Sequence, residues 1–76
     1  MTEDKYVLIE DYGILSSEDD GTTLKLVMAR WPSYKGSAKE PRYEIRKFNH
    51  AGVPGKGIRL SKEELENIKI ILDEIL

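Results

Sequence analysis

Alternating and β-branched hydrophobic positions run through the first sixty residues of the chain and predict strands. Residues 5–16 are rich in β-branched and aromatic types, with Gly13 as a bend or bulge. The following polar cluster ends in Asp20 and Gly21, a pair that tolerates the positive φ angles of a hairpin turn. A second strand is expected over about residues 22–31. Both of its faces are partly apolar, so the pattern leaves open which face is buried.

Two further strands are expected after a loop over residues 32–41, which contains glycine, serine and two prolines. The third strand, residues 42–48, has an apolar face of Tyr43 and Ile45. Its other face is half basic and ends in an aromatic ring, and it consists of Arg42, Glu44, Arg46 and Phe48. After a turn over residues 49–55, the fourth strand, residues 56–60, directs two apolar side chains inward and two residues outward. The inward pair is Ile58 and Leu60, and the outward pair is Gly57 and Arg59.

A C-terminal helix follows Ser61, which can cap it together with Glu64 in a capping box. An apolar stripe at helical spacing is expected to cover the inner face of the sheet, and it consists of Leu65, Ile68, Leu72, Ile75 and Leu76. Ile70 lies almost opposite this stripe and Ile71 lies at its edge. The second half of the helix is therefore apolar nearly all round, which favours a dimer interface through Ile70 and Ile71 over simple exposure.

These elements predict a single α+β domain over residues 1–76, with a four-stranded antiparallel sheet followed by one C-terminal helix. A chain of 76 residues hides only about 60% of the surface of its unfolded form, so a second copy or a ligand would help to close its core. The chain has no cysteine, which excludes disulfides, Cys-based zinc sites and thiol nucleophiles. Its apolar runs, such as residues 70–72, are far too short to span a bilayer. We expect a cytoplasmic protein with no membrane partner.

Charge is distributed unevenly along the chain, although the formal net charge is only −2. Residues 1–20 carry a net charge of −6, residues 21–60 carry +7, and residues 61–76 carry −3. The local electric field over one face decides whether a polyanion can approach. The net negative charge of the whole chain therefore does not exclude polyanion binding. The middle segment is therefore the candidate site for a polyanion.

Catalytic and metal chemistry find little support in the sequence. His50 is the only histidine and lies in an expected turn, without evident partners for a metal ion. The acidic turn over residues 18–20 lacks the ligand spacing of a calcium loop. In the segment 52–57, Lys56 is followed by Gly57 instead of Ser or Thr, and a strand follows, which excludes a nucleotide-binding phosphate loop. We expect no enzyme activity, no cofactor and no metal.

Basic and aromatic residues are interleaved on the third and fourth strands and in the loop beside them. Basic groups that follow a phosphate backbone, together with rings that stack on unpaired bases, are what single-stranded nucleic acid requires. The expected binding residues are Lys25, Trp31, Tyr34, Lys35, Arg42, Arg46, Phe48, Lys56 and Arg59. The alternative for Trp31 and for Phe48 is a place in the core. The only helix is acidic and unsuited to a DNA major groove.

Three short motifs precede the acidic amphipathic helix and together form a recognisable pattern. They are Pro-Arg-Tyr-Glu-Ile-Arg at 41–46, the ring of Phe48, and Gly-Lys-Gly-Ile-Arg-Leu-Ser at 55–61. In order and spacing the pattern resembles the positive cofactor four (transcriptional coactivator) family, most closely its small bacterial YdbC-like members. The resemblance covers about residues 21–76. It implies a strongly curved antiparallel sheet, a homodimer built through helices and sheets, and sequence-tolerant binding of single-stranded DNA.

By position, the resemblance carries the binding roles of the family over to Arg46, Phe48 and Lys56. It departs from the family where Phe48 replaces the usual Trp of bacterial relatives and where the loop over residues 32–40 is longer. It further implies a role in transcription, replication or repair, with proteins of those processes as partners, in the bacterial cytosol or at the nucleoid. Two alternatives stay open: a non-enzymatic protein-interaction module that uses the exposed aromatic and basic face, and RNA binding.

Overall fold

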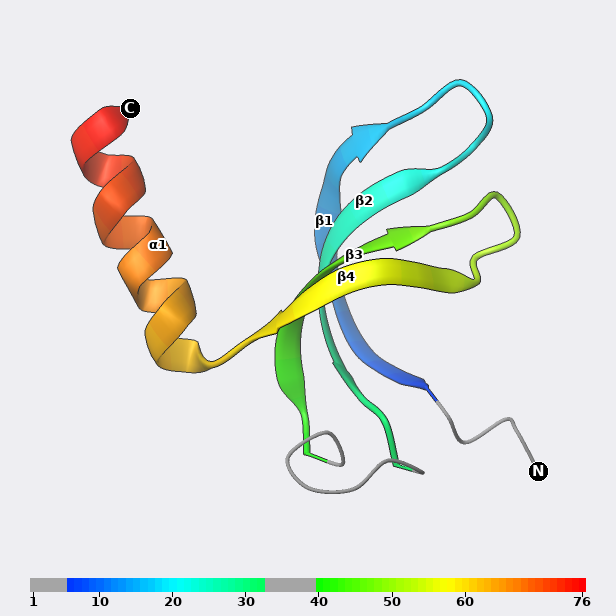
Figure 1. The fold of residues 1–76 in the computed structure, drawn as a ribbon, viewed down its shortest axis with the longest axis horizontal. Helices are drawn as coiled ribbons and strands as arrows, with labels where there is room; N and C mark the ends of the chain where they lie inside the picture. Colours follow the sequence, from blue (N-terminus) through cyan, green and yellow to red (C-terminus); the bar gives the residue numbers. More distant parts are fainter. Residues whose placement is uncertain (1–5, 33–39) are drawn as a thin grey trace.

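The fold is α+β: a four-stranded antiparallel sheet followed by one C-terminal helix (Figure 1). The computed structural model describes residues 6–32 and 40–76. The strands pair in the order of the sequence, β1-β2-β3-β4, each with its neighbour. Their bounds, and those of the helix, are β1 Val7–Ser17, β2 Thr23–Arg30, β3 Arg42–Phe48, β4 Pro54–Leu60 and α1 Lys62–Ile75.

The element bounds agree with the sequence prediction most closely for β3, whose two ends are those expected. Strand β4 begins two residues earlier than predicted, because Pro54 already pairs with Phe48. The β1–β2 turn contains Gly21 at a φ of 93°, which confirms the expected positive backbone angle. A Cβ at Gly21 would lie 2.7 Å from the Cβ of His50, so the turns of the two hairpins touch.

The strong curvature implied by the family resemblance is wrong for this chain, since the sheet is not strongly curled. Register shifts, which bend a strand, interrupt the β1–β2 pairing at three places, one of them at Gly13. The central pair β2–β3 keeps an unbroken register from Thr23–Phe48 to Ala29–Arg42. One further shift interrupts the β3–β4 pairing between Arg46 and Phe48. The irregularities thus lie in the two outer pairings, and the central pair carries no bulge that would curl the sheet.

The two faces of the sheet differ sharply in burial, and the structure decides which face of β2 is buried. Val27 and Ala29 are fully buried, whereas Leu26 and Met28 on the other face are only half-buried. The face with Val27 and Ala29, together with Glu44, Arg46, Phe48 and the rings of Tyr6 and Trp31, is called the Trp31 face below. The opposite face, with Leu26, Met28, Tyr43, Ile45 and Ile58, is called the helix face.

The structure confirms the predicted N-terminal cap of the helix but not its predicted packing against the sheet. The Ser61 side chain accepts a hydrogen bond from the Glu64 backbone N–H (3.1 Å), and the Glu64 carboxylate accepts one from the Ser61 N–H (2.7 Å). The expectation that the apolar stripe covers the sheet is wrong, because no residue of α1 is buried. The main contacts of the helix are with β3 and β4, and the helix then diverges from the sheet (Figure 1). Ile58, predicted to point inward, is consequently 56% exposed.

Within the described ranges, no helix has the length and apolar character needed to cross a membrane.

Candidate nucleic-acid interface

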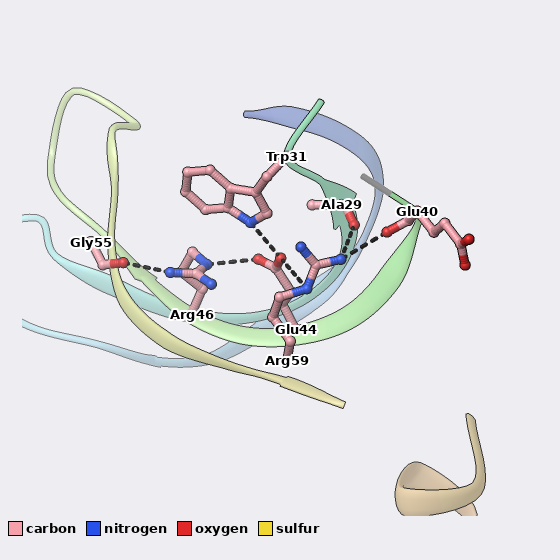
Figure 2. Close-up of polar contacts among 7 residues, drawn as sticks. All are labelled: Ala29, Trp31, Glu40, Glu44, Arg46, Gly55 and Arg59. Carbon is pink, nitrogen blue, oxygen red and sulfur yellow. Dashed lines mark hydrogen bonds and ion pairs between the residues drawn. The ribbon is translucent and has the colours of Figure 1, made fainter. Parts of the chain in front are cut away.

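A buried carboxylate organises the centre of the Trp31 face. Glu44 on β3 is fully buried and accepts a hydrogen bond from the Trp31 indole Nε1–H (2.9 Å). That bond is to Oε2 of Glu44, and Nε of Arg59 lies 3.5 Å from the same oxygen. Oε1 of Glu44 accepts a hydrogen bond from Nε of Arg46 (2.6 Å). Figure 2 shows these side chains converging on Glu44, with Trp31 just after the end of β2, Arg46 on β3 and Arg59 on β4. A buried charge is tolerated only when it is paired and hydrogen-bonded, and Glu44 meets both conditions.

The two arginines of this cluster also tie neighbouring strands together. Arg46 donates from NH1 to the carbonyl oxygen of Gly55 on β4 (2.7 Å). Arg59 donates from NH2 to the carbonyl oxygens of Glu40 (2.8 Å) and Ala29 (3.3 Å). Guanidinium groups suit this role because they carry several donors in a fixed plane. The cluster contains two cations and one anion, so it leaves a positive excess at the centre of the face.

The Trp31 ring is held on three sides and is half-buried. Its indole N–H is fixed by Glu44, and the guanidinium of Arg46 lies 5.1 Å from the ring centroid in a cation–π contact. The ring of Tyr6 meets it edge-on at a centroid distance of 4.7 Å. A partly exposed aromatic plane beside fixed cations is the arrangement on which an unpaired base stacks.

Tyr6 closes the cluster from the start of β1. Its ring also meets Phe48 edge-on at 6.1 Å. The hydroxyl oxygen is buried and has no hydrogen-bond partner among the described residues. Burial, reinforced by the negative charge of Glu44, raises the pKa of Tyr6 to about 12. The phenol therefore stays neutral across the physiological range.

Gly57 has a structural reason for its lack of a side chain. A Cβ at this position would lie 2.7 Å from the carbonyl oxygen of Ile45 and 2.8 Å from the Cα and Cβ of Arg46. Its register partner is Arg46 itself. The glycine thus lets β4 lie close over β3 where the Arg46 side chain begins, which is an ordinary packing role for the residue beside Lys56.

Other predicted binding residues lie around the cluster or apart from it. Lys25 lies on the Trp31 face, 2.9 Å from the Asp11 carboxylate and 5.5 Å from the centroid of the Phe48 ring. Arg42, the register partner of Ala29, is half-buried on the same face. Lys56 is exposed and lines a separate hollow of about 270 Å³ at the end of the β3–β4 hairpin. Tyr34 and Lys35 lie outside the described residues.

The expected exposure on this face is wrong for Arg46, and for Phe48 the alternative of a place in the core is confirmed. Arg46 is 8% exposed and Phe48 is 6% exposed, and Phe48 joins Val27 and Ala29 in the core. The physical reason is that the Trp31 and Tyr6 rings fold over the sheet and shield it. Glu44 and Tyr6 are part of this cluster but were not among the expected binding residues. The alternation Arg42-Glu44-Arg46 was a usable signal for Glu44, since it places one carboxylate between two guanidinium groups on a single face.

A comparison of the chain with protein-family models finds no match, and a comparison with curated proteins finds none either. The resemblance to the positive cofactor four family therefore rests on the motif residues described above and stays a prediction.

Proposed function

We propose that this protein binds single-stranded DNA with little sequence preference through the Trp31 face. The observation that carries the proposal is the half-buried Trp31 ring, fixed by Glu44 and stacked beside the Arg46 guanidinium. Base stacking on a ring is sequence-tolerant because every base has a π-face. Fixing the ring before binding lowers the entropy lost when a ligand binds.

Cations that remain accessible around the cluster supply the phosphate contacts in this proposal. Lys25, Arg42 and Arg59 share the Trp31 face and are half-buried, and Lys56 is exposed at the hairpin end. Arg46 is too deeply buried to meet a phosphate directly without moving, so its role is to orient Trp31 and to raise the local positive potential. Phe48 supports the cluster from the core.

The helix argues for single strands over duplex DNA. Reading a duplex requires a helix or a β-ribbon that enters a groove. Helix α1 carries Glu63 and Glu64 in its first turn and no basic residue in its last turn. It also lies on the opposite side of the sheet from Trp31, as its groove with Leu26 and Ile45 shows. Phosphates would be repelled by this element.

We further propose that the protein is a homodimer closed through the helix face. An apolar groove of about 410 Å³ runs between α1 and the sheet, and its wall includes Leu15, Ile45 and Leu65. Ile70 and Ile71 are 57% and 53% exposed on the same helix. Exposed apolar surface of this extent marks an association site. The groove is filled by a second copy of the chain in this proposal. Under two-fold symmetry, the apolar helix and sheet surfaces of each copy can cover those of the other. A sedimentation experiment that shows a monomer at high micromolar concentration would refute the dimer proposal.

Membership in the positive cofactor four family, as a small bacterial member, is part of the same proposal. It would place the protein in the bacterial cytosol or at the nucleoid, in transcription, replication or repair. The antiparallel sheet with a C-terminal helix and the basic, aromatic face support it. The absence of strong curvature is a departure from the family pattern.

The test is a titration of labelled oligo(dT), the matching duplex and oligo(U) at several salt concentrations, followed by quenching of Trp31, the only tryptophan. We expect oligo(dT) to bind more tightly than the duplex. The logarithm of affinity should fall with the logarithm of salt by about 0.7 for each phosphate contact. Equal affinity for both DNA forms, or no binding at low salt, would refute the proposal and favour a protein-interaction module. Tighter binding of oligo(U) would assign RNA as the ligand.

Two arginines on opposite faces provide a matched pair for this titration. Arg42 lies on the Trp31 face, and Arg30, at the end of β2 on the helix face, is similarly half-buried. Arg42→Gln should weaken binding and reduce the salt slope by about 0.7, whereas Arg30→Gln should leave the slope nearly unchanged. A reduced slope for both variants would show a diffuse charge effect instead of contact at the Trp31 face.

A further inference from the structure

An open hollow of about 390 Å³ lies on the Trp31 face between the ends of the two hairpins. Its lining includes Leu8 and Ile14 of β1, Lys25 of β2 and Phe48 of β3. Ile14 is the register partner of Lys25, so the two side chains lie side by side on one face. The hollow continues from the Trp31 cluster, because the Phe48 ring contacts Tyr6 and Tyr6 contacts Trp31.

Two apolar side chains in this hollow remain largely exposed to solvent. Ile14 is 58% exposed and Leu8 is 47% exposed, although Val27 and Ala29 on the same face are fully buried. A second copy seated in the groove beside α1 would lie on the other side of the sheet and would leave both side chains in water. Neither the core nor the proposed dimer therefore accounts for this apolar patch.

The chemistry of the lining suits a nucleobase. Aliphatic side chains pack against the flat face of an unstacked base, as they do in pockets that hold extruded bases. Thr23 and His50 also line the hollow, and a hydroxyl and an imidazole can hydrogen-bond to base edges. Lys25 is paired with Asp11 only at the surface, a weak pairing from which a phosphate can draw it. The volume lies near the lower end of the range for small-ligand pockets, which fits one nucleotide.

We propose that this hollow is a nucleobase subsite, in which one base of a bound single strand packs against Ile14 and Leu8 while Lys25 holds an adjacent phosphate. This inference rests on the proposed function and extends it: the binding path runs from Trp31 along β2 to the hairpin ends. About six residues of strand, roughly 20 Å, separate Lys25 from Trp31. The path is therefore long enough for several nucleotides.

Neighbouring residues on β1 provide a matched test. Ile14 faces the hollow, whereas Leu15, the next residue and 55% exposed, lines the groove beside α1. Ile14→Ser should weaken binding of labelled oligo(dT) by roughly 5- to 10-fold, the lower part of the range for one stacked base, with an unchanged salt slope. Leu15→Ser should change affinity by less than about twofold at a protein concentration where sedimentation gives the parent oligomeric state. Ile14→Ser should keep the parent's urea midpoint, because its side chain is exposed and lies outside the groove of the proposed dimer.

An abasic series adds a measurement that loss of stability would not mimic. In an oligo(dT) just long enough to fill the site, an abasic nucleotide at the position of the hollow should weaken binding to the parent. The same abasic nucleotide should have no further effect on Ile14→Ser, because the base and the side chain lose the same contact.

The outcomes separate this inference from the proposed function. If the parent binds oligo(dT) and Ile14→Ser binds it equally well, the subsite is refuted while single-strand binding stands. Equal losses for Ile14→Ser and Leu15→Ser would also refute it, since the effect would not follow the face. If the parent binds no oligonucleotide at all, both proposals fail together.

Discussion

Neutralising the buried carboxylate of Glu44 is expected to destabilise the fold far more than neutralising an exposed one. Glu44→Gln keeps the size of the side chain but turns one acceptor oxygen into an NH₂ group. That group would face the donor of either Trp31 or Arg46, which lie 2.9 Å and 2.6 Å from the two carboxylate oxygens. It would also leave two guanidinium groups at the centre of the face without their anion.

The magnitude follows from burial. Breaking a buried ion pair by removing one partner costs about 3 to 5 kcal/mol. A folded chain of 76 residues is stable by about 4 to 11 kcal/mol. Glu44, which is fully buried, is therefore expected to carry a large fraction of the stability of the domain.

Asp11→Asn is the matched control. Its carboxylate forms an ion pair of similar length with Lys25, 2.9 Å, but the Asp11 side chain is 39% exposed and the Lys25 side chain 26% exposed. Exposed pairs contribute about 0 to 1 kcal/mol. The same change from carboxylate to amide should thus have a small effect at Asp11 and a large one at Glu44.

Urea unfolding followed by Trp31 fluorescence measures the difference, since the indole donates directly to Glu44. All variants are compared at one protein concentration, because association contributes to apparent stability. A loss below about 1 kcal/mol for Glu44→Gln, with an unchanged urea dependence, would refute the role assigned to the carboxylate. Complete unfolding of Glu44→Gln supports that role only if Asp11→Asn folds like the parent.

Three further changes test the architecture of the Trp31 face. Phe48→Ala should lower the free energy of unfolding in urea by about 3 to 5 kcal/mol, because the ring is 6% exposed in the core. A variant as stable as the parent but with lower oligonucleotide affinity would instead show that Phe48 stacks on a base. Gly57→Ala should cost about 1 to 3 kcal/mol, since its Cβ would lie 2.7 Å from the Ile45 carbonyl oxygen. Gly55→Ala should be tolerated, because the nearest atom to its Cβ would lie at 3.6 Å. Equal melting temperatures for the two variants would contradict the close approach of β4 to β3 at Gly57. The pKa of Tyr6 is about 12 in the folded protein against 10 for a free phenol, so the unfolded chain loses this proton first and the free energy of unfolding should fall between pH 10 and 12. Tyr6→Phe should make that fall shallower and leave stability at pH 7 unchanged or higher, because a buried hydroxyl without a partner is removed; a lower stability at pH 7 would reveal a missed hydrogen bond.

Local signals in the sequence were sufficient for the order and type of the elements. The capping box at Ser61 and the alternation from Arg42 to Phe48 are short-range patterns, and both are confirmed. Positive φ at Gly21 was likewise predictable from the Asp-Gly pair. Backbone preference and side-chain periodicity act over a few residues, so one sequence is enough to find such features.

Only the tertiary structure decided which side chains are buried and which of them meet. Val27 and Leu26 are equally apolar, and the choice between them depended on the rings of Tyr6 and Trp31, which fold onto one face from the ends of two different strands. Phe48 and Ile58 exchanged their expected environments for the same reason, together with the divergence of α1 from the sheet. The pairing of Glu44 with donors from three strands is a long-range contact set by strand register, and register appears only when the whole sheet has formed.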